Sequence, residues 1–252
     1  MKIILFIVLL LNIAIAEDKV KDEKQKVTIG LGAYMQTQPY KGVDSIIMPS
    51  PVIFFDNSLF YIRWSRAGIY FYGDKSEDYS WGFSITAQPR PFGYKSSDSK
   101  YLKGMQERET TIEGGLAFSA LYKDSYIEMM LLTDILDRYD SWLFKTEIGD
   151  KYTIKKFSFY PSIIVSYQSD KFVDYYYGVT SDEATKQREE FTPNGGLQIG
   201  MQTYIKYPLT DSLATLINLR MDMIPYSAFN SPIIEDKVIY SGLASLIYTF
   251  EY

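Results

Sequence analysis

The feature that most constrains this chain is a two-residue alternation of apolar and polar side chains, repeated in segments of about ten residues. In residues 211–223, for example, Leu219 and Met221 occupy odd positions, whereas Asn218 and Asp222 occupy even positions. A period of two places the two kinds of side chain on opposite faces of a β-strand. The sequence therefore predicts strands with one apolar and one polar face.

We predict about twelve such strands, and most approach the roughly 9–11 residues that a transmembrane strand needs. The third and fourth are short. The expected strands are residues 27–36, 47–55, 58–64, 68–73, 80–89, 110–121, 125–133, 142–149, 157–168, 196–207, 211–223 and 238–252. They predict an all-β fold, a transmembrane antiparallel up-and-down β-barrel. A secreted β-sandwich is the alternative, because it would also account for part of the excess of Tyr and Phe.

The lengths of the connections favour the membrane barrel. Outer-membrane barrels alternate short periplasmic turns with longer outer loops. Here the short connections are residues 56–57, 73–79, 122–124, 150–156 and 208–210. The mostly long connections, which interleave with them, are residues 37–46, 90–109, 134–141, 169–195 and 224–237. The exception is the tight link 65–67, which falls where a long loop is expected.

The N-terminus is typical of an exported protein. Lys2 precedes a short apolar run, residues 3–11, and small residues follow at Ala14 and Ala16. This pattern predicts a signal peptide, residues 1–16, cleaved after Ala16. The apolar run is shorter than the ~20 residues of a membrane-spanning helix. The almost entirely charged residues 17–26 predict a flexible segment, and residues 27–252 form the expected barrel.

Composition limits the possible functions. Without residues 1–16 the chain has 25 basic and 31 acidic residues, a formal charge of −6, which gives no support to nucleic-acid binding. The chain contains no His and no Cys, which excludes Ser–His hydrolases, thiol chemistry and most zinc sites. We therefore expect no enzyme activity, no catalytic or metal site and no cofactor. Its 23 Tyr and 15 Phe fit the aromatic girdles of a membrane barrel.

Two carboxylates are the remaining candidates for chemistry. Glu113 and Glu128 lie opposite the apolar faces of neighbouring expected strands and would face the lumen together. A carboxylate pair could act in acid–base catalysis. Charges inside a barrel must be paired or hydrated, so we favour ion pairs instead. The expected basic partners are Arg220, Arg63, Lys145 or Lys206.

Two further segments lie in the longest expected loop. Tyr175–Tyr177 could be a recognition surface, but we favour the flared top of a strand that packs against its own loop. The charged segment Ser181–Glu190 predicts a solvated loop. Several glycines predict bending or close packing within strands, at Gly32, Gly114, Gly115, Gly195 and Gly196.

A series of short motifs, in order along nearly the whole expected mature chain, resembles the MipA/OmpV family of outer-membrane proteins. The motifs are Gln38-Pro39-Tyr40-Lys41-Gly42-Val43-Asp44, Pro49-Ser50-Pro51, Leu102-Lys103-Gly104-Met105, Glu113-Gly114, Tyr175-Tyr176-Tyr177-Gly178-Val179-Thr180 with Glu183-Ala184, Ser231-Pro232-Ile233 and Tyr248-Thr249-Phe250. One departure is clear. The family often has a Gly-His pair entering its middle strands, and the corresponding region here reads Trp142-Leu143-Phe144-Lys145.

The resemblance implies a non-catalytic scaffold in the bacterial outer membrane, in contact with outer-membrane lipid. Its implied partners are a periplasmic lytic transglycosylase and a peptidoglycan synthase, which remodel the cell wall. The residues leave two alternatives open. One is a narrow channel, since a barrel of about twelve strands lies between filled and open sizes. The other is a surface adhesin or antigen that uses the long outer loops.

Overall fold

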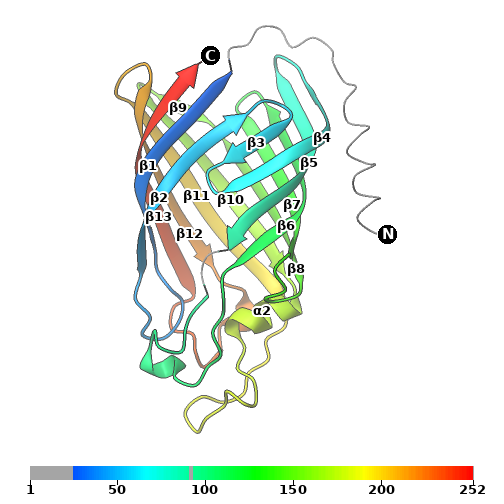
Figure 1. Ribbon diagram of the computed structural model, residues 1–252, viewed down its shortest axis with the longest axis vertical. Coiled ribbons are helices and arrows are strands. Elements are labelled where there is room, and N and C mark those ends of the chain that lie inside the picture. The colour runs from blue at the N-terminus through cyan, green and yellow to red at the C-terminus, as the bar shows by residue number, and fades with distance from the viewer. Residues whose placement is uncertain (1–24, 91–92, 252) are drawn as a thin grey trace.

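The computed structural model describes residues 25–90 and 93–251, and its strands form one closed antiparallel β-barrel (Figure 1). Successive strands pair with one another, and the last strand pairs with the first. The strands are β1 Lys26–Gln36, β2 Ile46–Asp56, β3 Phe60–Arg63, β4 Arg66–Lys75, β5 Tyr79–Arg90, β6 Thr111–Tyr122, β7 Ser125–Asp134, β8 Trp142–Asp150, β9 Tyr152–Ile154, β10 Phe157–Gln168, β11 Gly196–Pro208, β12 Leu213–Met223 and β13 Val238–Glu251.

The barrel has twelve strands in its wall, because β9 is a continuation of β8. Both strands pair with β10 in one register: Gly149 lies opposite Ser162, and Tyr152 lies opposite Phe159. The break between them falls at Lys151. The prediction of an all-β up-and-down barrel of about twelve strands is confirmed.

The alternation of side chains produces the two surfaces of this wall. On β12, Leu219 is 54% exposed on the outside, whereas Asn218 is 2% exposed and faces the lumen. The outward residues of neighbouring strands meet in the same way, as where Leu131 lies opposite Leu116. The apolar faces therefore form a continuous outer surface suited to lipid, as the sequence predicted.

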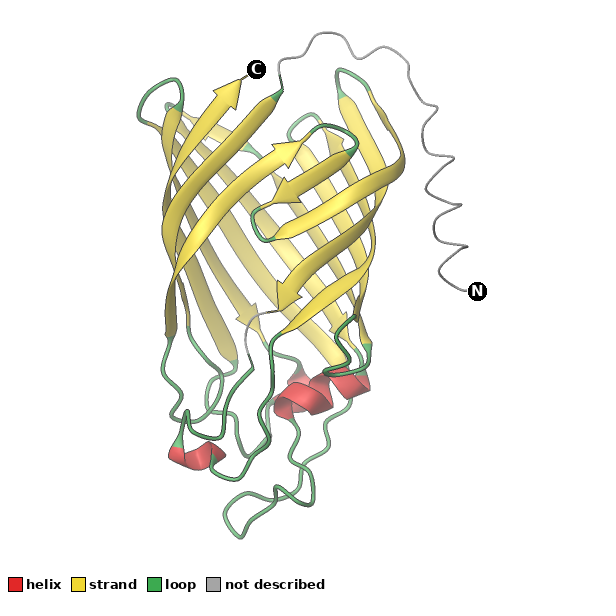
Figure 2. Ribbon diagram, viewed as in Figure 1, coloured by secondary structure: helices red, strands yellow, loops and turns green. Residues whose placement is uncertain are grey.

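The connections sort by length to the two ends of the barrel (Figure 2). Short turns lie at the end where the first strand begins and the last strand ends. The long loops lie at the other end, with the helices η1 Lys100–Leu102, α2 Asp170–Tyr177 and η2 Tyr226–Ala228. In an outer-membrane barrel the first end faces the periplasm and the second faces outward. No helix among the described residues is long and apolar enough to span a membrane.

The third and fourth strands differ most from their predicted bounds. Residues 58–64 and 68–73 were expected, whereas β3 is Phe60–Arg63 and β4 is Arg66–Lys75. The two residues between them, Trp64 and Ser65, form the tight link that replaces a long outer loop. Because β3 is only four residues long, this link lies part-way down the wall rather than at its outer end (Figure 1).

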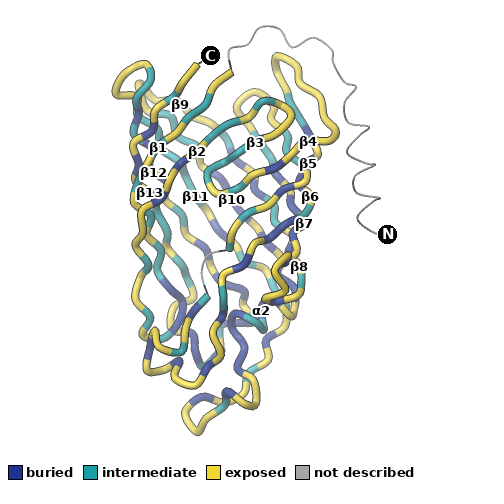
Figure 3. The backbone as a smooth tube through the Cα atoms, in the orientation of Figure 1, coloured by how far each residue is buried: buried dark blue, intermediate teal, exposed yellow. Residues whose placement is uncertain are grey.

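The loops pack around a cluster of buried side chains, the loop core, which closes the outer end of the barrel. Buried positions gather at this end in Figure 3. The loop core consists of Tyr40, Tyr94, Leu102, Met105, Tyr139, Phe172, Val173, Tyr176, Tyr177, Val179, Ile224, Ala228, Ile233 and Ile234.

The structure corrects the prediction for Tyr175–Tyr177. These residues lie in the helix α2 rather than at the top of a strand, and Tyr176 and Tyr177 are buried in the loop core. The alternation stops after Gln168, and the apolar residues then recur at helical spacing, with Phe172, Val173 and Tyr176 on one face. The expectation that they pack rather than form a surface holds for these two tyrosines.

The predicted signal peptide, residues 1–16, lies outside the described residues, as do residues 17–24 of the expected flexible segment. Within the described part, β1 begins at Lys26, one residue before the expected start of the barrel. Lys26 forms an ion pair with Glu251 at 2.9 Å, and both side chains are about half exposed or more.

Candidate functional site

The lumen contains a cavity of about 2890 Å³, whose lining reaches the turns at one end of the barrel. Inward-facing side chains from strands around the whole barrel line it. At the outer end of the barrel, the cavity ends against four residues of the loop core: Tyr40, Phe172, Tyr176 and Tyr177. Among the described residues, none between 93 and 118 or between 178 and 197 lines this cavity. Of the long outer loops, only residues 38–40 and the helix α2 line the cavity in the described part of the chain, so it ends against the loop core.

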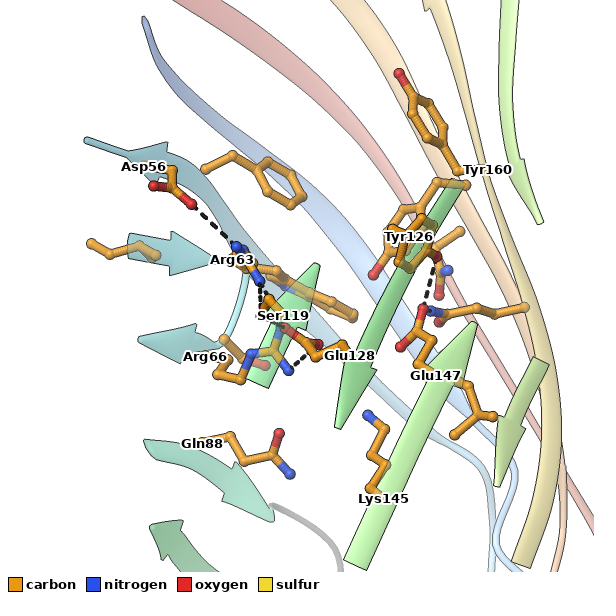
Figure 4. A pocket seen from close by; sticks show the side chains of 18 of the residues that line it. Asp56, Arg63, Arg66, Gln88, Ser119, Tyr126, Glu128, Lys145, Glu147 and Tyr160 are labelled. Carbon is orange, nitrogen blue, oxygen red and sulfur yellow. Dashed lines mark hydrogen bonds and ion pairs between the residues drawn. The ribbon is translucent and has the colours of Figure 1, made fainter. Parts of the chain in front are cut away.

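Glu128 holds the first charged cluster of the cavity (Figure 4). Its carboxylate pairs with Arg63 at 2.7 Å and with Arg66 at 2.5 Å, and Ser119 donates a hydrogen bond at 3.0 Å. Arg63 also pairs with Asp56 at 3.1 Å. The predicted pairing of Glu128 with Arg63 is therefore present. Arg66 could not be assigned from the sequence, because residues 65–67 had no predicted strand to give the side chain a direction.

Glu113 has a separate set of partners near the loop core. It pairs with Arg90, and it accepts hydrogen bonds from Gln88 at 2.8 Å and Tyr139 at 3.1 Å. The guanidinium of Arg90 also lies over the ring of Phe172, 4.7 Å from its centroid. Arg90 was missed as a partner because the sequence placed it in a loop.

The two glutamates do not form a carboxylate pair. Glu128 lies opposite Ser119, and Ser119 is six residues along β6 from Glu113. At ~3.3 Å per residue this places the two positions about 20 Å apart along the wall. Glycosidases place their two carboxyl groups within about 10 Å of one another. Acid–base catalysis by Glu113 and Glu128 acting together is therefore incompatible with this geometry.

A third carboxylate, Glu147, has neutral donors around it. Tyr126, Ser162 and Gln202 donate hydrogen bonds to it at 2.9, 2.9 and 2.7 Å. Lys145, two residues earlier on the same strand, also projects into the cavity (Figure 4). Lys145 therefore lines the cavity, but it is not an ion-pair partner of Glu113 or Glu128 as predicted.

Arg220 was also predicted to pair with Glu113 or Glu128, and this prediction is wrong. Arg220 pairs with Asp222 at 2.6 Å, two residues along the same strand and on the same face. Gln198 completes this cluster with a hydrogen bond to Asp222 at 3.0 Å. Lys206, the fourth predicted partner, lines the cavity, but the ion pairs of the two glutamates are with Arg63, Arg66 and Arg90, so this prediction is also wrong. The cavity thus presents mixed charges and hydrogen-bonding groups to a polar solute.

The loop core contains a buried ion pair that joins two loops. Arg108 and Glu183 pair at 3.0 Å with side-chain exposures of 6% and 2%. Glu183 also accepts hydrogen bonds from the backbone N–H groups of Gln106 at 2.8 Å and Thr180 at 3.0 Å. Burial alone would raise the pKa of Glu183. The backbone donors and Arg108 outweigh it and hold the pKa below its ordinary value.

The prediction that Ser181–Glu190 is a solvated loop is therefore wrong for two of its charged residues. Glu183 is buried as described, and Arg188 is buried with hydrogen bonds to the carbonyl oxygens of Tyr101 at 2.7 Å and Lys103 at 3.3 Å. A charged segment can be buried when another loop supplies the partners, which a pattern of charges cannot reveal.

Comparison with known proteins agrees with the barrel. The model of the family described as MltA-interacting protein MipA matches residues 29–250. The chain belongs to the MipA family. The resemblance predicted from the sequence motifs is thus confirmed.

Three relatives illustrate the MipA family. The MltA-interacting protein of Escherichia coli K12 is 24% identical over 230 residues, which cover 90% of each chain. The outer membrane protein YiaT of the same strain is 22% identical over 229 residues, covering 89% of this chain and 91% of its own. The outer membrane protein OmpV of Vibrio cholerae is 24% identical over 182 residues, covering 71% of this chain and 69% of its own. These names describe interacting or outer membrane proteins rather than enzymes. This MipA-family barrel belongs to the bacterial outer membrane.

Proposed function

We propose that this MipA-family barrel is a non-catalytic scaffold that holds a periplasmic cell-wall protein, of the lytic transglycosylase kind, at the outer membrane. A peptidoglycan synthase is a further partner of the same complex. The observation that supports this most is the asymmetry of the barrel. Its outer end is filled by the loop core, whereas its turn end is open. A partner on the periplasmic side therefore meets an accessible mouth and exposed turns.

The relatives support the choice of partner. One relative of matching length is named for its interaction with MltA, and it aligns with 90% of this chain. The proposal carries that partner over to this chain.

The test is photo-crosslinking in intact cells. A photoreactive amino acid is placed at the exposed turn residues Lys123 and Leu209, and the matched control at the exposed outer-loop residue Gln187. We expect crosslinks to a periplasmic lytic transglycosylase from the turn positions and none from the loop position. Folded barrel that yields no such crosslink from turn positions around the whole rim would contradict the scaffold.

A narrow channel for small solutes is the second candidate, and the cavity of about 2890 Å³ favours it. Its polar clusters around Glu128, Glu147 and Asp222 would suit hydrophilic solutes. The loop core argues against a continuous path, so conduction would require the loops to rearrange. Single-channel recording separates the two functions.

A further inference from the structure

The barrel wall has an interrupted region between β2 and β5. Strand β3 pairs only with the last three residues of β2, from the Phe54–Arg63 pair to the Asp56–Tyr61 pair. Residues 46–53 of β2 pair with β1 on one side, but among the described residues no strand pairs with them on the other side. Likewise β4 pairs with β5 only as far as Ala87, so the last three residues of β5 lack a neighbour on the same side.

The direction of the backbone on β2 follows from one hydrogen bond. The N–H of Trp64 donates to the carbonyl oxygen of Ile53 at 2.8 Å, so the polar groups of Ile53 point toward the β3 side. In an antiparallel strand this direction recurs at every second residue. The backbone nitrogens of Pro51 and Pro49 therefore face the interrupted region, and neither carries a hydrogen.

The same reasoning applies to the other rim. The N–H of Ile135 donates to the carbonyl oxygen of Ile112 at 3.0 Å, so Ile112 directs its polar groups toward β7. Pro89 is the partner of Ile112 on β5, and its nitrogen therefore points away from β6, toward the interrupted region. Prolines thus stand on both rims at positions where an N–H would lack a partner. An unpaired N–H in hydrocarbon is costly, so proline at these positions reduces the number of unpaired donors that the edge presents to lipid.

The cavity reaches the rims of this region. Its lining includes Pro49, Pro51 and Pro89, whose side chains lie on the outward face of the wall. Met48 faces inward but is 42% exposed, whereas Val52, on the same face of β2, is fully buried. Because no described strand stands between these two rims and the cavity lines both of them, we take the lumen to reach the outer surface at this point.

The chemistry changes across the interruption. Outside, Ile47 is 72% exposed beside the prolines, so the rim is apolar. Inside, the cavity is lined by the polar side chains of Arg66 and Gln88, which project from neighbouring strands (Figure 4). The guanidinium groups of Arg63 and Arg66 both pair with Glu128 here. An apolar rim beside two guanidinium groups matches a molecule that has an apolar chain and an anionic head.

We propose that this interruption is a lateral portal. Through it, a membrane phospholipid inserts its acyl chain or its head group from the bilayer into the lumen. The outward-facing residues around the interruption are apolar, so this part of the wall contacts the hydrocarbon of the bilayer. The phosphate would compete with Glu128 for the guanidinium groups of Arg63 and Arg66. The portal is independent of the proposed scaffold function.

The test uses the full chain in liposomes that contain phosphatidylglycerol with a photoreactive acyl chain, and adducts are mapped by mass spectrometry. Outward-facing residues should be labelled all round the barrel. We also expect adducts at the inward-facing residues Met48 and Gln88. The inward-facing controls, Ser162 and Asn218, lie in strands paired on both sides and should remain unlabelled. Labelling restricted to outward-facing residues at β2 and β5 would overturn the portal.

A blocking variant tests the path itself. Met48→Trp should fill the opening and abolish adducts at Gln88, while Leu31→Trp, on the outward face of β1, should leave them unchanged. Folded Met48→Trp barrel with full labelling of Gln88 would overturn the proposal. If Met48→Trp does not fold, Gln88→Trp should block the opening from the other rim. The measurement is then the loss of lipid adducts at Met48. Inward labelling by a photoreactive free fatty acid but not by the phospholipid would also overturn it.

Discussion

At the scale of single residues, a side chain points either toward lipid or toward the lumen, and this direction determines which residue types the position tolerates. Neighbouring residues of one strand experience lipid and lumen in turn, so the same substitution should have very different costs at adjacent positions. Leu219 and Asn218 are such a pair, and their exposures of 54% and 2% agree with the faces predicted from the sequence.

We expect Leu219→Arg to lower the free energy of unfolding by about 2–4 kcal/mol if the residue lies near the bilayer midplane, because it places a charge in lipid. Asn218→Arg should cost far less, since Asn218 lines the water-accessible cavity. Urea titration of folded barrel in lipid vesicles measures both. Equal losses for the two variants would mean that the face assignment is incorrect.

The Arg108–Glu183 ion pair makes a prediction about pH. The folded-state pKa of Glu183 lies below its ordinary value of 4.5. The ionised carboxylate therefore stabilises the loop core above that ordinary pKa, and this stabilisation is lost as the pH falls through the folded-state pKa. The protection of the backbone amides of residues 93–110 and 178–195 against hydrogen exchange, relative to their intrinsic exchange rates, should fall in that acidic range.

Glu183→Gln should show lower protection already at neutral pH and no further loss of protection on acidification. Removing one partner of a buried pair typically costs about 3–5 kcal/mol, because it leaves the other charge uncompensated. The control Glu189→Gln changes an exposed carboxylate of the same loop and should leave exchange unchanged. An identical pH response in wild type and Glu183→Gln would show that another group is responsible.

At the scale of elements, the last strand closes the barrel. Strand β13 pairs with β1 over eleven residue pairs, from Lys26–Glu251 to Gln36–Ser241. Without this pairing both strands would present unpaired backbone groups inside the membrane. Tyr248 and Phe250 lie on the outward face, where aromatic side chains suit the membrane interface.

Deletion of residues 250–252 should therefore impair closure and leave protein in the periplasm. Replacing Thr249 and Glu251 by other polar residues should be tolerated. The Lys26–Glu251 ion pair is exposed, so it adds little to closure. Heat-modifiable gel mobility of outer-membrane fractions separates folded barrel from unfolded chain. A normal amount of folded barrel after the deletion would argue against a closing role for these residues.

At the scale of the whole molecule, the barrel is open at one end and filled at the other, and this asymmetry determines whether it conducts ions. We expect purified wild-type protein in planar bilayers to give no steady single-channel steps. Replacing Phe172, Tyr176 and Tyr177 together by Ala should remove the inner surface of the loop core and produce them.

The matched control is Tyr226→Ala, because Tyr226 is an exposed loop tyrosine outside the loop core. This variant, like the wild type, should give no steady single-channel steps. Steady steps from the wild-type protein would favour the channel over the sealed scaffold, and a silent triple variant with an intact barrel would mean that other contacts seal the lumen.

Much of this protein can be predicted from local pattern. Side-chain alternation, connection parity and the aromatic last strand identify the barrel, its orientation and the lipid face, because each strand's two faces meet different solvents. Ion-pair partners are less predictable. Arg63 was identified for Glu128, whereas Arg90 and Arg66 were not, because their directions depend on strand ends that alternation does not locate.

What the sequence by itself determined is the class of molecule: a barrel wall with an apolar outside, since the membrane selects for that alternation in every strand. What only the tertiary structure decided is how the strands and loops meet. The fold of the long loops into a core around α2, the burial of Glu183 with Arg108, and the interruption beside Pro49 and Pro89 all depend on contacts between segments far apart in the chain. Such contacts are set by register and by three-dimensional packing, and a local period of two residues carries no information about either.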